Sequence, residues 1–143
     1  MKNINFEQNI NLSNYTTIKV GGFAEYFSKP TNTFELINLI KWSDLNNQEC
    51  RVIGAGSNLL INNIFLKGLT ICTKKMTSLK IEPLTGIVEA EAGVMLPALS
   101  NLLAKNGLQG GEWAVGIPGT VGGAIYMNAG SGKISFANNI LSV

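Results

Sequence analysis

Glycine placement restricts the fold of this chain more than any other feature of its sequence. Glycine lacks a Cβ, so it reaches backbone conformations that other residues avoid and lets other groups approach the main chain closely. A short cluster, Gly54-Ala55-Gly56-Ser57-Asn58, directly follows the apolar pair Val52-Ile53. A longer stretch holds seven of the 16 glycines: Gly107, Gly110, Gly111, Gly116, Gly119, Gly122 and Gly123. The fold must therefore contain two bends whose surfaces are largely main chain.

The patterns around these bends predict an α+β fold, and 143 residues suit one domain or two small lobes. Alternating β-branched and apolar residues predict strands over Thr16–Val20, Ala24–Ser28, Arg51–Ile53 and Leu69–Thr73, and a hairpin of Leu79–Glu82 with Ile87–Ala92. Helical spacing predicts helices over Thr31–Leu45, Leu96–Asn106 and Ala124–Asn128. We expect residues 1–15 to form an extended or loosely ordered lead-in. The apolar end, Ile140–Val143, predicts the beginning of a strand and so indicates a truncated chain.

The two longer helices carry recognisable end signals. Asn32 is the expected N-cap of the first, with Glu35 as its capping-box partner. Pro97 suits the first turn of the second helix, and Gly107 suits the position just past its end. The apolar stripe expected on the first helix comprises Phe34, Leu36, Ile37, Ile40 and Leu45.

Composition excludes several classes of function. The net charge is only +2, the basic residues are scattered, and Arg51 is the only arginine, so we expect no nucleic-acid binding. The chain has no histidine and no CxxC spacing, which argues against a zinc site and excludes a serine–histidine or cysteine–histidine nucleophile. Cys50 and Cys72 are predicted to be reduced core residues. No apolar run approaches the ~20 residues that span a bilayer, so we expect no membrane association and a cytoplasmic location.

The cluster at Gly54 has the composition of an anion-binding loop. A buried strand delivers the chain to small residues, where successive N–H groups can point at one phosphate. Ser57 and Asn58 add side-chain donors, and with a single arginine a diphosphate would rely mainly on main-chain N–H groups. A tight turn between strands is the alternative, because neither the G-x-G-x-x-G fingerprint nor the Walker loop is complete here.

The second cluster, Gly116–Ala124, combines glycines with the apolar residues Ile117 and Val121. A helix beginning near Val121 would add partial positive charge at its N-terminus. A solvated glycine-rich loop is the alternative, although such a loop has no need of apolar residues. Two loops of this kind suit one extended dinucleotide cofactor.

Three segments resemble the UDP-N-acetylenolpyruvoylglucosamine reductase family of flavin enzymes. Asn14–Ala24 resembles its entry strand and double glycine, Ile53–Leu60 its diphosphate loop, and Gly116–Gly130 its second flavin loop. The resemblance implies an FAD-binding domain of the vanillyl-alcohol-oxidase (PCMH) type, over residues 16–143, with FAD held non-covalently between two α+β lobes. It implies these cofactor-binding residues: Gly54, Ala55, Gly56, Ser57, Asn58, Leu59, Gly116, Ile117, Pro118, Gly119, Thr120, Val121, Gly122 and Ala124.

The same resemblance implies NADPH as co-substrate and a UDP-sugar substrate in peptidoglycan synthesis. The arginine, serine and glutamate that serve the family's chemistry match no residue here, and we expect them beyond Val143. Neither Arg51 nor Ser57 matches them, so no catalytic residue is assigned and the isolated chain is expected to be inactive. Another FAD-dependent oxidoreductase of the same fold and a non-catalytic FAD- or nucleotide-binding fragment remain alternatives. The absence of histidine rules out a histidyl-linked flavin.

Overall fold

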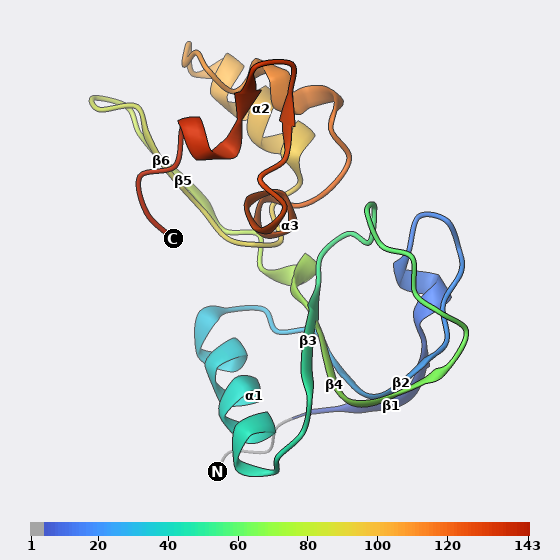
Figure 1. Cartoon of the computed structure of the whole chain (residues 1–143). Coiled ribbons are helices and arrows are strands. Elements are labelled where there is room, and N and C mark those ends of the chain that lie inside the picture. The colour runs from blue at the N-terminus through green and yellow to red at the C-terminus, as the bar shows by residue number, and fades with distance from the viewer. Residues whose placement is uncertain (1–4) are drawn as a thin grey trace. The chain divides into compact units, whose positions relative to one another are not determined.

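The computed structural model describes residues 5–143, which divide into two compact units (Figure 1). Unit 1 is Met1–Met76 and unit 2 is Thr77–Val143. Each unit has its own hydrophobic core, so each is described by itself.

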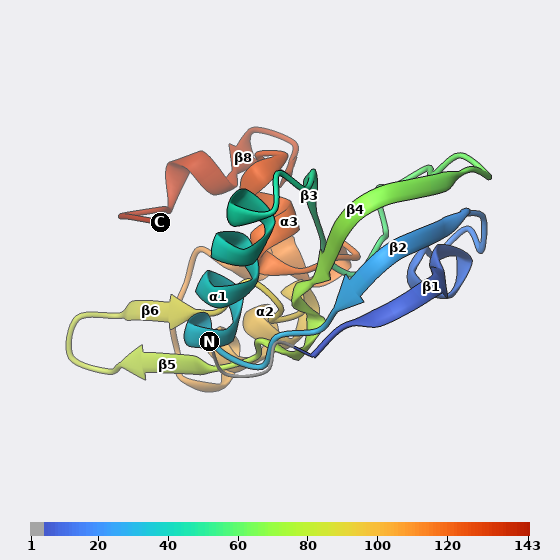
Figure 2. The same ribbon diagram turned by 90° about the horizontal axis from the view of Figure 1, so that it is seen from below.

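Unit 1 is built on a four-stranded sheet in the order β1-β2-β4-β3 (Figure 2). The strands are β1 (Glu7–Asn11), β2 (Phe23–Ser28), β3 (Cys50–Ile53) and β4 (Phe65–Cys72). Strand β1 runs antiparallel to β2, whereas β2 and β3 both run parallel to β4. The predicted strands Ala24–Ser28, Arg51–Ile53 and Leu69–Thr73 are confirmed, and β4 begins four residues earlier than predicted.

Each face of this sheet is covered by a different segment. Helix α1 (Thr33–Leu45) covers one face, where Leu39 packs with Leu69 and Ile71. A 3-10 turn, Leu12–Tyr15, belongs to the core on the other face, with Phe27 and Cys72. From Leu69 to Cys72 every residue of β4 is buried, with Leu69 and Ile71 in the core beneath α1 and Cys72 in the core on the other face.

Helix α1 begins at its predicted cap but buries a different face from the one predicted. The side chain of Asn32 accepts a hydrogen bond from the Glu35 N–H at 2.9 Å, while the Glu35 carboxylate accepts from the N–H and hydroxyl of Thr31. The two hydrogen bonds from Thr31 lower the pKa of Glu35. Ile37 and Ile40 of the predicted stripe are exposed, and Leu39 and Ser43 are buried instead.

Aromatic packing accounts for this orientation. Trp42 lies 4.4 Å from the ring of Phe6 and 5.3 Å from that of Tyr26, measured between ring centroids. Contacts of this kind stabilise by about 1 kcal/mol each beyond the area they bury. Apolar residues occur on every face of α1, so their spacing alone does not show which face is buried. The contacts of Trp42 with Phe6 and Tyr26 determine that face.

The N-terminal segment is more regular than expected. Residues 7–11 of the expected lead-in form β1 and residues 12–15 form the 3-10 turn; residues 1–4 lie outside the described residues. The predicted strand Thr16–Val20 is a turn. The Lys19 N–H donates to the Thr16 carbonyl, the Thr16 hydroxyl donates to the Val20 carbonyl, and Lys19 has a φ of 58°.

Unit 2 combines a hairpin, two helices and a second, very short hairpin. Strands β5 (Leu79–Glu82) and β6 (Ile87–Ala90) confirm the predicted hairpin, and helix α2 (Leu96–Lys105) ends before Gly107, whose φ is 69°. Helix α3 (Val121–Tyr126) begins three residues before the predicted one. Strands β7 (Gly130–Ser131) and β8 (Ile134–Ser135) complete the unit, and residues 140–143 form no strand, contrary to prediction.

The two cysteines have different surroundings. Both are free thiols; Cys72 is buried as predicted, whereas Cys50 is exposed and the prediction for it is wrong. Cys50 begins the edge strand β3, so one side of its strand lacks a neighbour. Burial raises the pKa of the Cys72 thiol. Within residues 5–143, no helix has the length and apolar character needed to cross a membrane.

Replacing the N-cap residue tests the basis of α1. We expect Asn32→Ala to lower the free energy of unfolding of unit 1 by about 1 kcal/mol, because an N–H of the first turn loses its acceptor. Urea unfolding in a Trp113→Phe background isolates the signal of Trp42, the other of the chain's two tryptophans. The exposed Asn63→Ala is the matched control. Equal stability of Asn32→Ala and Asn63→Ala would contradict the assigned cap.

Candidate functional site

The carboxyl ends of three parallel strands meet at one edge of the unit 1 sheet. Ser28, the last residue of β2, is in register with Ile71 of β4, and Ile53, the last residue of β3, is in register with Cys72. In open sheets of this kind, ligands bind beyond the carboxyl ends of parallel strands. The loop Gly54–Asn58 leaves β3 at this edge, and the 3-10 turn Thr73–Lys75 leaves β4 beside it.

The loop after β3 is held by contact with the turn at residues 15–17. Gly56 has a φ of 71°, and a Cβ added to it would lie 1.9 Å from the Tyr15 carbonyl oxygen. The Thr17 N–H donates to the Gly56 carbonyl at 3.1 Å, and the Thr17 hydroxyl approaches the same oxygen at 3.4 Å. Only glycine fits this position, because both the backbone conformation and the space exclude a side chain.

The bonds that fix this loop are accepted by its carbonyl oxygens. Besides Gly56, the Gly54 carbonyl oxygen lies 3.8 Å from the Cys72 sulfur. Fixing the loop in this way does not consume the amides of Ala55 and Gly56. A rigid loop that keeps its N–H donors is suited to an anion.

A cavity of about 330 Å³ opens beside this loop. Its walls come from the turn after β1, from the loop after β3 and from the turn after β4. The residues that line it are Asn14, Tyr15, Thr16, Thr17, Lys19, Ala55 and Lys74. Two of these residues are lysines, and none of the described residues that line it carries a carboxylate. Two lysines and three hydroxyl-bearing residues therefore lie around the cavity.

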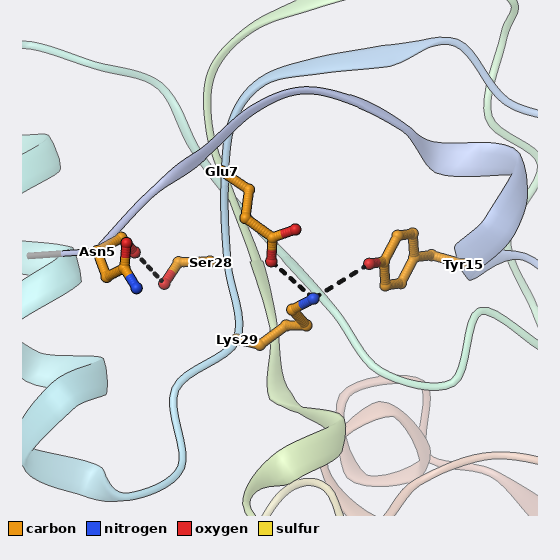
Figure 3. A network of polar contacts seen from close by, with 5 residues as sticks. All are labelled: Asn5, Glu7, Tyr15, Ser28 and Lys29. Atoms are coloured by element: carbon orange, nitrogen blue, oxygen red, sulfur yellow. Dashed lines mark hydrogen bonds and ion pairs between the residues drawn. The ribbon is translucent and has the colours of Figure 1, made fainter.

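A neighbouring cluster on the same edge is electrically paired (Figure 3). The Lys29 amino group lies 2.6 Å from a Glu7 carboxylate oxygen and 3.4 Å from the Tyr15 hydroxyl. It also lies 5.9 Å from the centroid of the Tyr15 ring and 5.6 Å from that of Phe27. The hydrogen bond with Glu7 is the main reason that the pKa of Lys29 is raised. Lys29 therefore supports Tyr15, a residue that lines the cavity, and its charge is already paired with Glu7.

A larger cavity of about 410 Å³ lies near the start of α1, and several of its polar residues are already paired. Lys29 is paired with Glu7, the Ser28 hydroxyl donates to the Asn5 carbonyl, and the Glu35 carboxylate accepts from Thr31. It contains no glycine loop. We therefore place the candidate site at the smaller cavity, because the glycine loop lies beside it and the described residues that line it include two lysines and no carboxylate.

The second predicted loop lies in unit 2 and is held differently. The N–H groups of Val121 and Gly122 donate to the carbonyls of Val94 and Ala92, and the Thr120 side chain accepts from the Gly123 N–H. A Cβ on Gly122 would lie 2.7 Å from that of Ala92, so this glycine permits close packing within the unit. Gly119, with a φ of 142°, allows the bend before α3.

The predicted site residues thus fall into two groups. Gly54–Asn58 and the following Leu59 lie at or beside the strand edge in unit 1. Gly116, Ile117 and Pro118 precede the bend of unit 2, and Thr120, Val121 and Ala124 are buried in it. The amides of Val121 and Gly122 are used internally, so a contribution from these residues would come through shape and apolar contact.

Sequence reasoning missed Lys19 and Lys74. Lys19 lies in a segment predicted to be a strand, and Lys74 carries no sequence signal beyond its charge. Lys19 lies beside Ala55 because the hydrogen bond from Thr17 to Gly56 joins segments that are 39 residues apart. Lys74 lies there because the Thr73 hydroxyl ties the turn after β4 to the Ile53 carbonyl at the end of β3. The resemblance of Asn14–Ala24 to an entry segment was the one signal that pointed to this region.

The sequence matches a family model described as FAD binding domain over residues 24–143. A UDP-N-acetylenolpyruvoylglucosamine reductase from Prochlorococcus marinus subsp. pastoris is 79% identical over 143 residues, which are 100% of this chain and 48% of that protein. A protein of the same name from a Synechococcus species is 48% identical over 128 residues, covering 90% of this chain and 42% of the relative. The chain therefore spans about half the length of the curated relatives it matches.

Solved structures agree with the sequence matches. The crystal structure of a UDP-N-acetylenolpyruvylglucosamine reductase (MurB) from Thermus caldophilus superimposes with a TM-score of 0.72 at 32% identity, over 89% of this chain and 43% of that one. A 6-hydroxy-D-nicotine oxidase from Arthrobacter nicotinovorans gives a TM-score of 0.52 at 15% identity, over 65% of this chain and 20% of that one. These matches confirm the predicted α+β fold of the FAD-binding type and the resemblance stated from the sequence.

Substituting Gly56 tests whether its contact with Tyr15 shapes the site. We expect Gly56→Ala to lower the free energy of unfolding of unit 1 by about 3 kcal/mol, since a Cβ meets a backbone carbonyl and the positive φ disfavours alanine. The Trp42 signal in urea measures this loss.

The control is Gly123→Ala in unit 2, where the added Cβ would meet only the Thr120 hydroxyl oxygen at 3.5 Å. We expect that variant to keep its stability. A Gly56→Ala protein as stable as the parent would show that the two segments are not in contact.

Proposed function

Because this chain belongs to the FAD binding domain family, we propose that it is the cofactor-holding portion of a UDP-N-acetylenolpyruvoylglucosamine reductase. One observation carries the proposal: a glycine loop stands at the carboxyl edge of parallel strands, beside a cavity that two lysines line. The match of the entire chain to a reductase at 79% identity supports the choice of reaction.

The residues at this edge fit the central part of FAD. A diphosphate needs main-chain donors that approach it closely and positive charge nearby. Gly54–Asn58 would provide the donors, with Ser57 and Asn58 adding polar side chains. The loop Gly116–Ala124, with Ile117 and Val121, would provide apolar contact for the flavin side of the cofactor.

The proposed reaction is the reduction of UDP-N-acetylglucosamine enolpyruvate by NADPH, as in peptidoglycan synthesis. FAD supplies the hydride transfer when bound, and the protein supplies binding, orientation and exclusion of water. NADPH as co-substrate, the UDP-sugar substrate and a cytoplasmic location all belong to the proposal. Residues 16–143 would act as part of the FAD-binding domain.

The residues of this chain support non-covalent attachment of the flavin. The chain has no histidine to form a histidyl-flavin. Cys72 is buried against the Gly54 carbonyl, and burial raises the pKa of its thiol, so little of it is thiolate near neutral pH. The flavin would therefore be held by contacts alone.

The chain's own share of the activity would be cofactor binding. The family's catalytic arginine, serine and glutamate match no residue here, and Arg51 is occupied by its ion pair with Glu49 and its hydrogen bond to the Lys67 carbonyl. We therefore propose that this chain binds FAD and does not turn over the substrate alone.

A flavin absorbance spectrum of the purified chain, followed by acid precipitation, tests the proposal. We expect a yellow protein or one that takes up added FAD, with all flavin released into the supernatant. NADPH oxidation in the presence of UDP-N-acetylglucosamine enolpyruvate should stay at the background rate. The full-length protein, assayed in parallel, should oxidise NADPH.

Three outcomes would contradict it. Flavin retained in the precipitate would show covalent attachment. Turnover by the chain alone would show that it carries the catalytic residues. Failure of the full-length protein to oxidise NADPH with this substrate, while still containing FAD, would favour another oxidoreductase of the same fold.

A further inference from the structure

Positive charge at the carboxyl edge of the unit 1 sheet comes from several side chains that differ in whether they are already paired. Lys29 follows β2 and Lys74 follows β4, while Lys19 reaches the same region from the turn at residues 16–20. We infer that Lys19 and Lys74 form a two-lysine clamp for the diphosphate of the bound nucleotide. This inference rests on the proposed function and assigns the charge partners of that site.

Lys29, the cation that follows β2 at this edge, is already neutralised. Lys29 is bound by the Glu7 carboxylate and the Tyr15 hydroxyl (Figure 3). Arg51, the only arginine, is paired with Glu49 and donates to the Lys67 carbonyl at 2.6 Å. A ligand that used either cation would have to break an existing interaction.

Lys19 and Lys74 show the opposite pattern. Both line the 330 Å³ cavity with Ala55, and within residues 5–143 neither forms an ion pair. No carboxylate from any described lining residue enters this cavity. Two lysines that line one cavity repel each other, and a ligand with two negative charges bound there would relieve that repulsion.

The backbones that carry the two lysines are fixed, so both side chains start from defined positions beside the cavity. Lys19 sits at a φ of 58° inside a turn closed by the Thr16 hydroxyl, which donates to the Val20 carbonyl at 2.8 Å. Beside Lys74, the buried Thr73 hydroxyl donates to the Ile53 carbonyl at 3.3 Å, which ties the turn after β4 to β3.

This arrangement defines which ligands the cavity should prefer. A diphosphate can contact two ammonium groups and the amides of the loop at once, whereas a monophosphate offers one charged centre. Compounds without phosphate, such as riboflavin, gain nothing from the lysines. Because the lysines are exposed, their effect should weaken as ionic strength rises.

The direct test uses inorganic pyrophosphate as the probe, followed by amide NMR spectra of the 143-residue chain. We expect saturable shifts of the Ala55 and Gly56 signals, with pyrophosphate binding more tightly than inorganic phosphate. Lys19→Gln and Lys74→Gln should each raise the Kd for pyrophosphate about three- to tenfold, and the double variant should raise it more. Lys74→Arg should retain most of the affinity.

Lys41→Gln is the matched control, since Lys41 is an exposed lysine of α1 that does not line this cavity. It should bind pyrophosphate as the parent does. The dispersion of each amide spectrum shows directly whether a variant is folded, so loss of binding is separable from loss of structure.

An FAD titration in parallel separates this inference from the proposed function. If FAD binds but pyrophosphate shifts neither Ala55 nor Gly56, or if both lysine variants bind pyrophosphate as the parent does, the clamp is refuted while the FAD proposal stands. If pyrophosphate binds in a lysine-dependent way and neither the chain nor the full-length protein takes up FAD, the clamp is supported and the FAD proposal is refuted.

Discussion

The site in unit 1 depends on one contact, the packing of the Gly56 backbone against the carbonyl of Tyr15. It joins the loop that follows β3 to the end of the 3-10 turn that follows β1. The hydrogen bond from the Thr17 N–H to the Gly56 carbonyl closes the contact at 3.1 Å. Without it, Ala55 and Lys19 would have no reason to face the same cavity, and the loop would be a turn between strands, as the alternative interpretation of the sequence holds.

The direction of hydrogen bonding separates the two glycine clusters. The loop at Gly54 is fixed through its carbonyls, so that fixing leaves donors for an anion. The bend before α3 is fixed through the amides of Val121 and Gly122, and its glycines serve close packing and an unusual φ. Two loops of similar glycine content therefore differ in which main-chain groups hold them in place. The first cluster suits a diphosphate, whereas the second suits a flat apolar group lying against the protein.

Charge pairing adds a second level of organisation at the same strand edge. Glu7 of β1 neutralises Lys29, which in turn holds Tyr15 in the wall of the cavity. Lys19 and Lys74 line that cavity without a carboxylate neighbour among the described residues. The structure thus separates cations that support the site from cations that are available to a ligand. The resemblance to flavin reductases did not make this distinction.

Sequence alone predicted the parts of the fold that depend on local patterns. The cap at Asn32, the hairpin at β5 and β6, and the end of α2 at Gly107 all follow from neighbouring residues, and all are present. The failures involve partners distant in the chain. Thr16–Val20 alternates like a strand, but a positive φ at Lys19 and the contact with Gly56 make it a turn. The face of α1 that is buried depends on Phe6 and Tyr26, which helical spacing cannot show.

The most direct test of the site is a crystal structure of the chain with FAD. The geometry predicts the diphosphate against the amides of Ala55 and Gly56, with the amino groups of Lys19 and Lys74 within hydrogen-bond distance of its oxygens. A cofactor bound with its diphosphate away from this strand edge, while the Gly56 contact with Tyr15 stays intact, would contradict the assignment of the site.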